Sequence, residues 1–271
     1  MQKEGKKTAE NTIFYIILGI LPFLAALICL GIGRYSMSVS ETVTTLFSRF
    51  TNAKVDNTAY TVIFNVRLPR IILAAVVGAG LSCAGAAFQG LFSNPLATPD
   101  TLGVASGASF GAVLAMLIGG NMIGIQGMAL IFGLISCLIT FLIGRSSRRG
   151  SIVMIVLAGL VVSSVFEALV SLMKYVADPQ DELPVITYWL MGSMSRANYK
   201  NLVMGIPFIV IGIIIIFALR WRLNILSFNE DEARSLGVNV KILRVAFILA
   251  SSMITASCVS MCGQVGWVGL L

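Results

Sequence analysis

The sequence predicts an all-α polytopic membrane protein with about seven transmembrane helices. Hydrophobic residues make up 57% of its 271 residues and charged residues only 11%, far from the balance of a soluble domain. Apolar runs of about twenty residues recur along the chain, and a run of that length crosses the roughly 30 Å hydrocarbon core of a bilayer. The net charge of +7 comes mostly from Lys and Arg between these runs, a pattern typical of topology signals and contact with membrane lipids. Nucleic-acid binding is therefore not expected.

The chain begins with a basic segment and a long apolar run. Lys3, Lys6 and Lys7 precede the run, which is too long for the apolar region of a signal peptide. We therefore expect an uncleaved first span with its amino end in the cytoplasm. Residues 34–66 are polar and predict an external loop with one interfacial helix.

The remaining apolar runs alternate across the membrane and form, with the first, a single transmembrane domain over residues 1–271. The cluster of Arg145, Arg148 and Arg149 then falls on the cytoplasmic side, as the positive-inside tendency requires. The predicted spans cover residues 12–33, 68–88, 101–119, 128–143, 151–174, 202–219 and 241–261.

Two loops carry more information than the others. Between the second and third spans, Pro95 and Pro99 restrict the residues before them to extended conformations and so predict a sharp turn. The Gly, Ala and Ser residues around this turn indicate closely packed helices, either in ordinary packing or along a translocation path. In the cytoplasmic loop 222–240, Asn229 and Glu232 form a capping box and Gly237 a helix stop, which predicts a short helix.

One acidic residue, Glu167, lies well inside a predicted span, and Lys174 follows it by seven residues on the same helical face. An acid in a membrane span indicates a polar pathway or a proton relay. The alternative is a carboxylate paired with Lys174 or with another helix near the outer interface. The sequence alone leaves both interpretations open.

Other patterns give little support to catalysis or metal binding. Residues 107–111 match G-x-S-x-G, but the chain has no histidine, so Ser109 lacks the usual general base. Cys258 and Cys262 lie four residues apart on one helical face and fit helix packing better than a soft-metal site. The chain has no P-loop motif. We expect neither a cofactor nor an enzyme active site; a membrane-embedded enzyme would show a catalytic dyad or a metal cluster.

Three segments resemble the permease subunits of the iron-siderophore and vitamin B12 ABC importers, which are type II importers. They read RLPRIILAAVVGAGLSCAGAAFQGLFSNPLATPDTLGVASGA, NEDEARSLGVNV and GQVGWVGL. The resemblance implies ten helices per subunit, of which this chain holds about seven, so we expect it to be incomplete at its carboxyl end. It also implies a bacterial cytoplasmic membrane, ABC ATPase subunits, an extracytoplasmic substrate-binding lipoprotein and a second permease subunit, identical or different.

The resemblance also implies roles for individual residues. Arg67 and Arg70 would accept glutamates of the binding protein, which suits the bidentate pairing of guanidinium with carboxylate. Asn94 and Leu96 would form the cytoplasmic gate. The helix that couples the permease to its ATPase would contain Asn229, Glu230, Asp231, Glu232, Ala233, Arg234, Ser235, Leu236 and Gly237.

The function expected from this resemblance is ATP-driven import of iron-siderophore chelates, or of haem or cobalamin-like chelates. The preference for iron reflects how common that cargo is in the family. The alternative is an ion- or proton-coupled secondary transporter, which would show paired intramembrane acids. Glu167 is the one residue that favours it.

Overall fold

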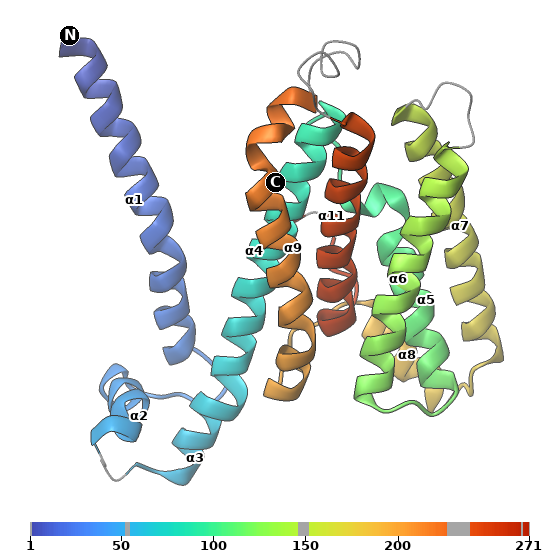
Figure 1. Ribbon diagram of the computed structural model, residues 1–271. Coiled ribbons are helices and arrows are strands. Elements are labelled where there is room, and N and C mark those ends of the chain that lie inside the picture. The colour runs from blue at the N-terminus through green and yellow to red at the C-terminus, as the bar shows by residue number, and fades with distance from the viewer. Residues whose placement is uncertain (1, 52–54, 146–151, 227–238, 267, 271) are drawn as a thin grey trace. The chain divides into compact units, whose positions relative to one another are not determined.

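The computed structural model covers residues 1–271 and describes all of them except 1, 52–54, 146–151, 227–238, 267 and 271. In the described part of the chain every regular element is a helix, which confirms the predicted fold class (Figure 1). The helices are α1 (Gln2–Gly31), α2 (Val39–Thr51), α3 (Asn57–Thr61), the π-helix η1 (Val62–Arg67), α4 (Leu68–Phe92), the 3₁₀-helix η2 (Pro99–Leu102), α5 (Val104–Leu117), α6 (Met122–Arg145), α7 (Ile152–Val176), α8 (Glu182–Leu190), α9 (Tyr199–Leu226) and α11 (Val240–Cys262).

Each predicted span contains a helix, but the third span differs from its prediction. Among the residues that the structure describes, six helices are long and apolar enough to cross a membrane, and helix α5, with 14 residues, is a shorter apolar helix beside them. The predicted range 101–119 is too long because its first residues form η2, and left-handed Gly103 (φ 75°) separates η2 from α5. The six long stretches are Phe14–Gly31, Asn57–Phe92, Met122–Gly144, Met154–Val176, Tyr199–Ile225 and Val240–Cys262.

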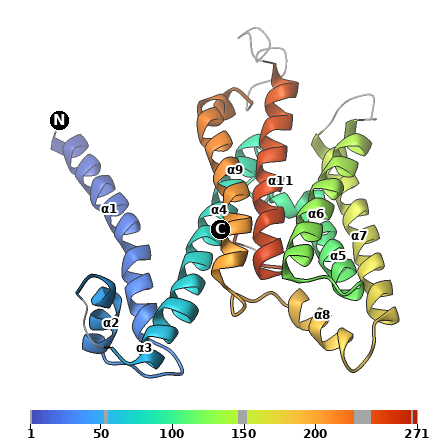
Figure 2. The same cartoon turned by 60° about the horizontal axis from the view of Figure 1, so that its bottom comes forward.

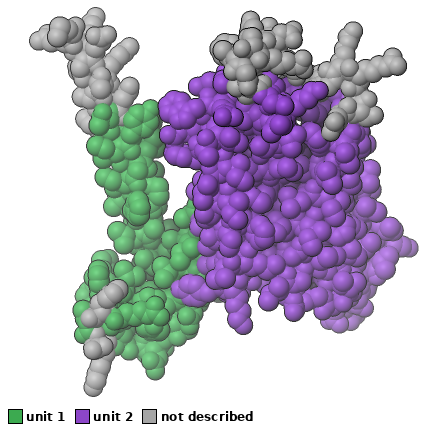
Figure 3. All heavy atoms as spheres, viewed as in Figure 1, with its two compact units in different colours: residues 1–75 green, residues 76–271 purple. Residues whose placement is uncertain are grey.

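The chain divides into two compact units after Ala75 (Figure 3). The first unit, residues 1–75, contains α1, α2, α3, η1 and the first turns of α4. Its small core is formed by Leu30, Ile63 and Phe64, with Leu46 of α2 packed against them. The segment 34–66 thus holds α2, α3 and all of η1 except Arg67, where the sequence predicted one helix.

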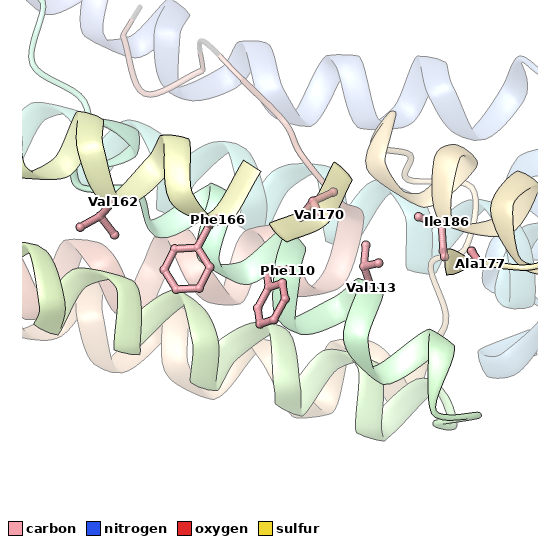
Figure 4. Packing of buried hydrophobic residues seen from close by; sticks show 7 residues of the cluster. All are labelled: Phe110, Val113, Val162, Phe166, Val170, Ala177 and Ile186. Atoms are coloured by element: carbon pink, nitrogen blue, oxygen red, sulfur yellow. The ribbon is translucent and has the colours of Figure 1, made fainter. Parts of the chain in front are cut away.

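The second unit, residues 76–271, has a core of aromatic and aliphatic side chains between α5, α7 and α8 (Figure 4). The Phe110 ring lies 5.1 Å from the Phe132 ring and 5.6 Å from the Phe166 ring, centroid to centroid. Ile186 of α8 is fully buried in the same cluster, and Figure 2 shows α8 beside the lower ends of α5 and α7.

Glycines on α5 let it pack closely on α6. A Cβ at Gly107 would lie 2.5 Å from the Cβ of Ser136, and one at Gly111 would lie 2.3 Å from the carbonyl oxygen of Met128. Both distances are shorter than any real contact, so only glycine fits at these positions. In lipid the hydrophobic effect does not drive helices together. The van der Waals packing that such close approach allows stabilises their association instead.

Asparagine side chains start three of the long helices. Asn121 Oδ1 accepts a hydrogen bond from Gly124 N at 2.8 Å, and Asn198 Oδ1 accepts one from Asn201 N at 2.8 Å. Asn239 Oδ1 accepts one from Ile242 N at 3.2 Å. Each cap satisfies an amide that the first helical turn leaves without a partner, and so fixes where α6, α9 and α11 begin.

Candidate functional site

The turn between α4 and η2 presents an apolar side chain on a defined loop. Asn94 Oδ1 accepts a hydrogen bond from Leu96 N at 2.9 Å, and the Asn94 carbonyl accepts one from Ala97 N at 3.1 Å. Ser93 takes the left-handed conformation (φ 48°) that reverses the chain after α4. The Leu96 side chain is 71% exposed, whereas its neighbour Ala97 is buried. Of the two predicted gate residues, Asn94 thus fixes the backbone that carries Leu96.

Two hydroxyl groups of α6 hold the far end of η2, where it joins α5. Ser136 Oγ donates a hydrogen bond to the Gly103 carbonyl at 2.6 Å, and Thr140 Oγ1 donates one to the Leu102 carbonyl at 2.9 Å. Both side chains are fully buried. The Gly103 carbonyl also accepts a hydrogen bond from Gly107 N at 2.9 Å. A buried carbonyl without a donor would cost about 1–3 kcal/mol, so the Thr140 bond to Leu102 contributes most to the stability of the junction of η2 and α5. Sequence reasoning missed both residues, although a Ser and a Thr four positions apart within an apolar run are a signal of this kind.

Glu167 lies on α7 and is exposed, and its carboxylate oxygen Oε1 accepts a hydrogen bond from Ser106 Oγ of α5 at 3.1 Å. Ser106 itself is buried. The polar partner of Glu167 is thus a hydroxyl on a neighbouring helix, where the sequence offered Lys174 as one possibility.

The segment after α11 is non-helical and packs against several helices of the second unit. Gln264 Nε2 donates a hydrogen bond to Ser109 Oγ at 2.9 Å, and Ser109 Oγ donates to the Ala105 carbonyl at 2.8 Å. The Ser109 hydroxyl of the G-x-S-x-G match is therefore both donor and acceptor within the fold. Gln89 Nε2 donates to the Leu270 carbonyl at 3.1 Å, which ties the same segment to α4.

Arg67 and Arg70 differ sharply in their surroundings within the first unit. Arg67 is buried, and its guanidinium donates hydrogen bonds from Nη1 to the Leu30 carbonyl and from Nη2 to the Tyr35 carbonyl. Gly33 leaves room for it, since a Cβ there would lie 2.7 Å from Nη2. Arg70 is exposed. In this structure, then, Arg67 closes the carboxyl end of α1, and of the two arginines Arg70 is the one at the surface.

The predicted coupling residues, Asn229 to Gly237, lie outside the residues that the structure describes. Their flanks are described: α9 ends at Leu226, and α11 begins at Val240 with Asn239 as its cap. Among the residues described, no group of three or more His, Cys, Asp or Glu side chains could hold a metal ion. Cys262 Sγ donates to the Cys258 carbonyl at 2.9 Å, an ordinary bond within a helix.

Comparison with known proteins places this arrangement in a family. The model of the FecCD transport family matches residues 20–271. The "Molybdate import system permease protein MolB" of Haemophilus influenzae is 41% identical over 255 residues, which cover 94% of this chain and 75% of that protein. The "Hemin transport system permease protein HmuU" of Yersinia pestis is 31% identical over 269 residues, which cover 94% of this chain and 76% of that protein.

A solved structure supports the same assignment. The structure, described as an inward-facing conformation of a metal-chelate type ABC transporter, matches with a TM-score of 0.83 and 39% sequence identity. The match covers 95% of this chain and 79% of that one. On the family match, the sequence identities and the shared fold, the chain belongs to the FecCD transport family.

Proposed function

We propose that this chain is a permease subunit of an ATP-driven importer in a bacterial cytoplasmic membrane, and that it has no catalytic activity of its own. The observation that carries the proposal is the family match over residues 20–271, together with relatives named as import and transport permeases. Its partners would be ABC ATPase subunits, a second permease subunit and an extracytoplasmic substrate-binding protein.

The gate of this importer would be the turn that carries Leu96. A gate must be rigid in itself and moved as a whole, and the bonds from Asn94, Ser136 and Thr140 meet the first requirement. An exposed leucine on such a turn suits contact with the same residue of a second permease subunit, which would close the path with apolar groups.

A continuous set of contacts could transmit movement from the ATPase to this gate. Helix α11 follows directly on the predicted coupling residues, and its Ser252 Oγ donates a hydrogen bond to Cys137 Sγ of α6 at 3.1 Å. Cys137 is adjacent in sequence to Ser136, which bonds to the Gly103 carbonyl at the end of η2, the element that follows the gate turn. A shift of α11 would thus reach Gly103 through two packed helices.

The cargo that we propose is a metal chelate of the ferric siderophore, haem or cobalamin type. Glu167 supports this choice, because a charged group in a membrane span faces a polar path or another protein chain in preference to lipid. A carboxylate on the path would repel a small dianion and tolerate a large chelate whose charge is shielded. Molybdate is the second candidate, favoured by the 41% identical Haemophilus relative.

Uptake by proteoliposomes tests both the proposed ATP-driven mechanism and the proposed cargo. They would contain this full chain with its ATPase and its binding protein, and radiolabelled ferric siderophore, haem and molybdate would be offered in turn. We expect chelate uptake that requires ATP on the ATPase side and that persists when ionophores collapse the ion gradients. Uptake driven by an ion gradient without ATP would overturn the importer proposal, whereas ATP-dependent uptake of molybdate alone would overturn only the cargo.

A further inference from the structure

Helix α2 divides into three faces, each of different chemistry. Ser38 and Glu41 fix its start through reciprocal bonds, from Glu41 N to Ser38 Oγ at 3.1 Å and from Ser38 N to Glu41 Oε2 at 3.3 Å. One face packs inward and includes Thr42, Thr45 and Leu46. A second face is polar and exposed and includes Ser40 and Thr44, and the third is apolar and exposed and consists of Val39, Val43 and Phe47.

The apolar face is a regular stripe. Val39, Val43 and Phe47 follow one another at four-residue intervals, so they lie in a row along the helix. Their side chains are 79%, 49% and 53% exposed. Thr51, next to Phe47 on the following turn, adds little polarity to the stripe, because its Oγ1 donates a hydrogen bond to the Phe47 carbonyl at 3.0 Å.

Contacts within the first unit place α2 at the level where α1 leaves the hydrocarbon. The apolar span Phe14–Gly31 has 18 residues, about 27 Å at 1.5 Å per residue, close to the roughly 30 Å thickness of the hydrocarbon core. Leu30 in the last turn of α1 packs in the same cluster as Leu46 of α2. Figure 1 shows α2 beside this end of α1. The exposed, apolar Ile32 continues the lipid-facing surface of α1 toward α2.

We propose that α2 lies in the membrane interface and inserts the stripe of Val39, Val43 and Phe47 among the lipid acyl chains. An interfacial helix needs a polar face toward water and an apolar face toward lipid, and α2 has both, besides the face that packs on its own unit. The stripe contains no charged residue and continues the lipid-facing surface of α1, and both features favour lipid over a charged protein partner. Helix α2 would then brace η1, and with it Arg67, against the membrane surface.

Tryptophan quenching tests the proposal on the full chain reconstituted in phosphatidylcholine vesicles. Phe47→Trp would place a tryptophan in the stripe, and Thr44→Trp would place one on the polar face of the same helix as the matched control. The emission of the three native tryptophans is subtracted by means of the unsubstituted protein. For Phe47→Trp we expect a blue-shifted difference spectrum that loses intensity in acyl-brominated lipid. For Thr44→Trp we expect quenching by aqueous acrylamide.

Three results would overturn the proposal. Equal quenching of both variants by acrylamide would mean that the stripe faces water. Shielding of the Phe47→Trp variant from both quenchers would mean that protein covers the stripe. Loss of lipid quenching when a purified binding protein is added would make the stripe a protein-docking surface. A circular dichroism spectrum equal to that of the unsubstituted chain shows for each variant that the helices have formed.

Discussion

Gln89 and Leu270 are 181 positions apart in the sequence, yet the Gln89 side-chain amide donates a hydrogen bond to the Leu270 carbonyl at 3.1 Å. One turn earlier on α4, Gly85 lies so close to Gly269 that a Cβ on Gly85 would be 1.8 Å from the Gly269 carbonyl oxygen. Backbone meets backbone here, and this is possible because Gly85 has no side chain. The last described residues of the chain are thus seated on α4 by a glycine and a glutamine one turn apart.

The close packing of Gly85 against Gly269 predicts opposite effects on stability for two glycine substitutions in α4. Gly85→Ala should destabilise the protein by about 1–3 kcal/mol, because a methyl group cannot fit against a rigid backbone. Gly78→Ala is the matched control: nothing lies within 4 Å of its added Cβ, and alanine favours the helix by up to about 1 kcal/mol. Thermal unfolding in detergent, followed by circular dichroism, measures both. Equal melting temperatures for the two variants would contradict the close packing.

A second pair of glycines separates backbone strain from crowding. Gly103 and Gly119 have φ angles of 75° and 72°, so alanine brings similar left-handed strain, of order 1 kcal/mol, to each. A Cβ at Gly103 would lie 2.9 Å from Ser136 Oγ and 3.0 Å from Ser163 Oγ, whereas none of the neighbouring atoms comes within 4 Å at Gly119. We expect Gly103→Ala to lower the melting temperature more than Gly119→Ala and to reduce transport as well. The same loss in both would show that the gate turn is not held from α6.

The hydroxyls that hold the gate turn can be removed singly. Thr140→Val should cost about 1–3 kcal/mol, since it takes the side-chain donor from the buried Leu102 carbonyl. Ser136→Ala should cost less, about 1 kcal/mol, since the Gly103 carbonyl keeps its bond from Gly107 N at 2.9 Å. Ser164→Ala serves as control, because Ser164 is exposed on α7 and its hydroxyl bonds to the Leu160 carbonyl of its own helix. In the reconstituted complex we expect the first two variants to hydrolyse ATP with less uptake per ATP. Unchanged coupling in both would remove Ser136 and Thr140 from the gate mechanism.

Substitutions of Arg67 and Arg70 should have different effects, the first on hydrogen exchange and the second on the affinity of the binding protein. Arg67→Ala removes two charged hydrogen bonds from the end of α1 and should cost about 3 kcal/mol, seen as faster hydrogen exchange in residues 28–37. Arg70→Ala should leave that exchange unchanged and weaken the affinity of the binding protein, measured by titration. Normal exchange in Arg67→Ala would refute its role at α1, and normal affinity in Arg70→Ala would end the docking proposal for that residue.

Glu167 distinguishes the two transport mechanisms. Gln keeps an oxygen that can accept the bond from Ser106 but cannot release a proton. For ATP-driven import we expect Glu167→Gln to keep uptake within a few-fold of the unsubstituted protein. A proton-coupled carrier would lose uptake altogether, and uptake assays with and without ATP separate these outcomes.

The long helices could be predicted from the sequence, and the local roles of several site residues could not. Bilayer thickness dictates the length of an apolar run, so α7 and α11 follow from composition within two residues at each end. Helix α6 begins six residues before its predicted span, and α9 ends seven residues after its own. The burial of Arg67 depends on carbonyls 37 and 32 positions away, which no local pattern indicates. The hydrogen bond from Ser106 to Glu167 joins residues 61 positions apart, and no local pattern indicates it either. The docking, gate and coupling roles stay predictions carried by family resemblance.

The shortness of α5 has a consequence for where the importer opens. Fourteen residues make a helix about 21 Å long, which falls about 9 Å short of the hydrocarbon thickness. At least one of its ends must therefore sit below the level of the lipid headgroups, where bare peptide groups are not tolerated. At the end of α5 next to η2, the hydrogen bonds from Ser136 and Thr140 give the peptide carbonyls of Gly103 and Leu102 the partners that they need at this depth. The mouth of the conduit would then be a recess sunk into the leaflet on the side of η2, and the barrier that a cargo must cross would be thinner than the membrane around it.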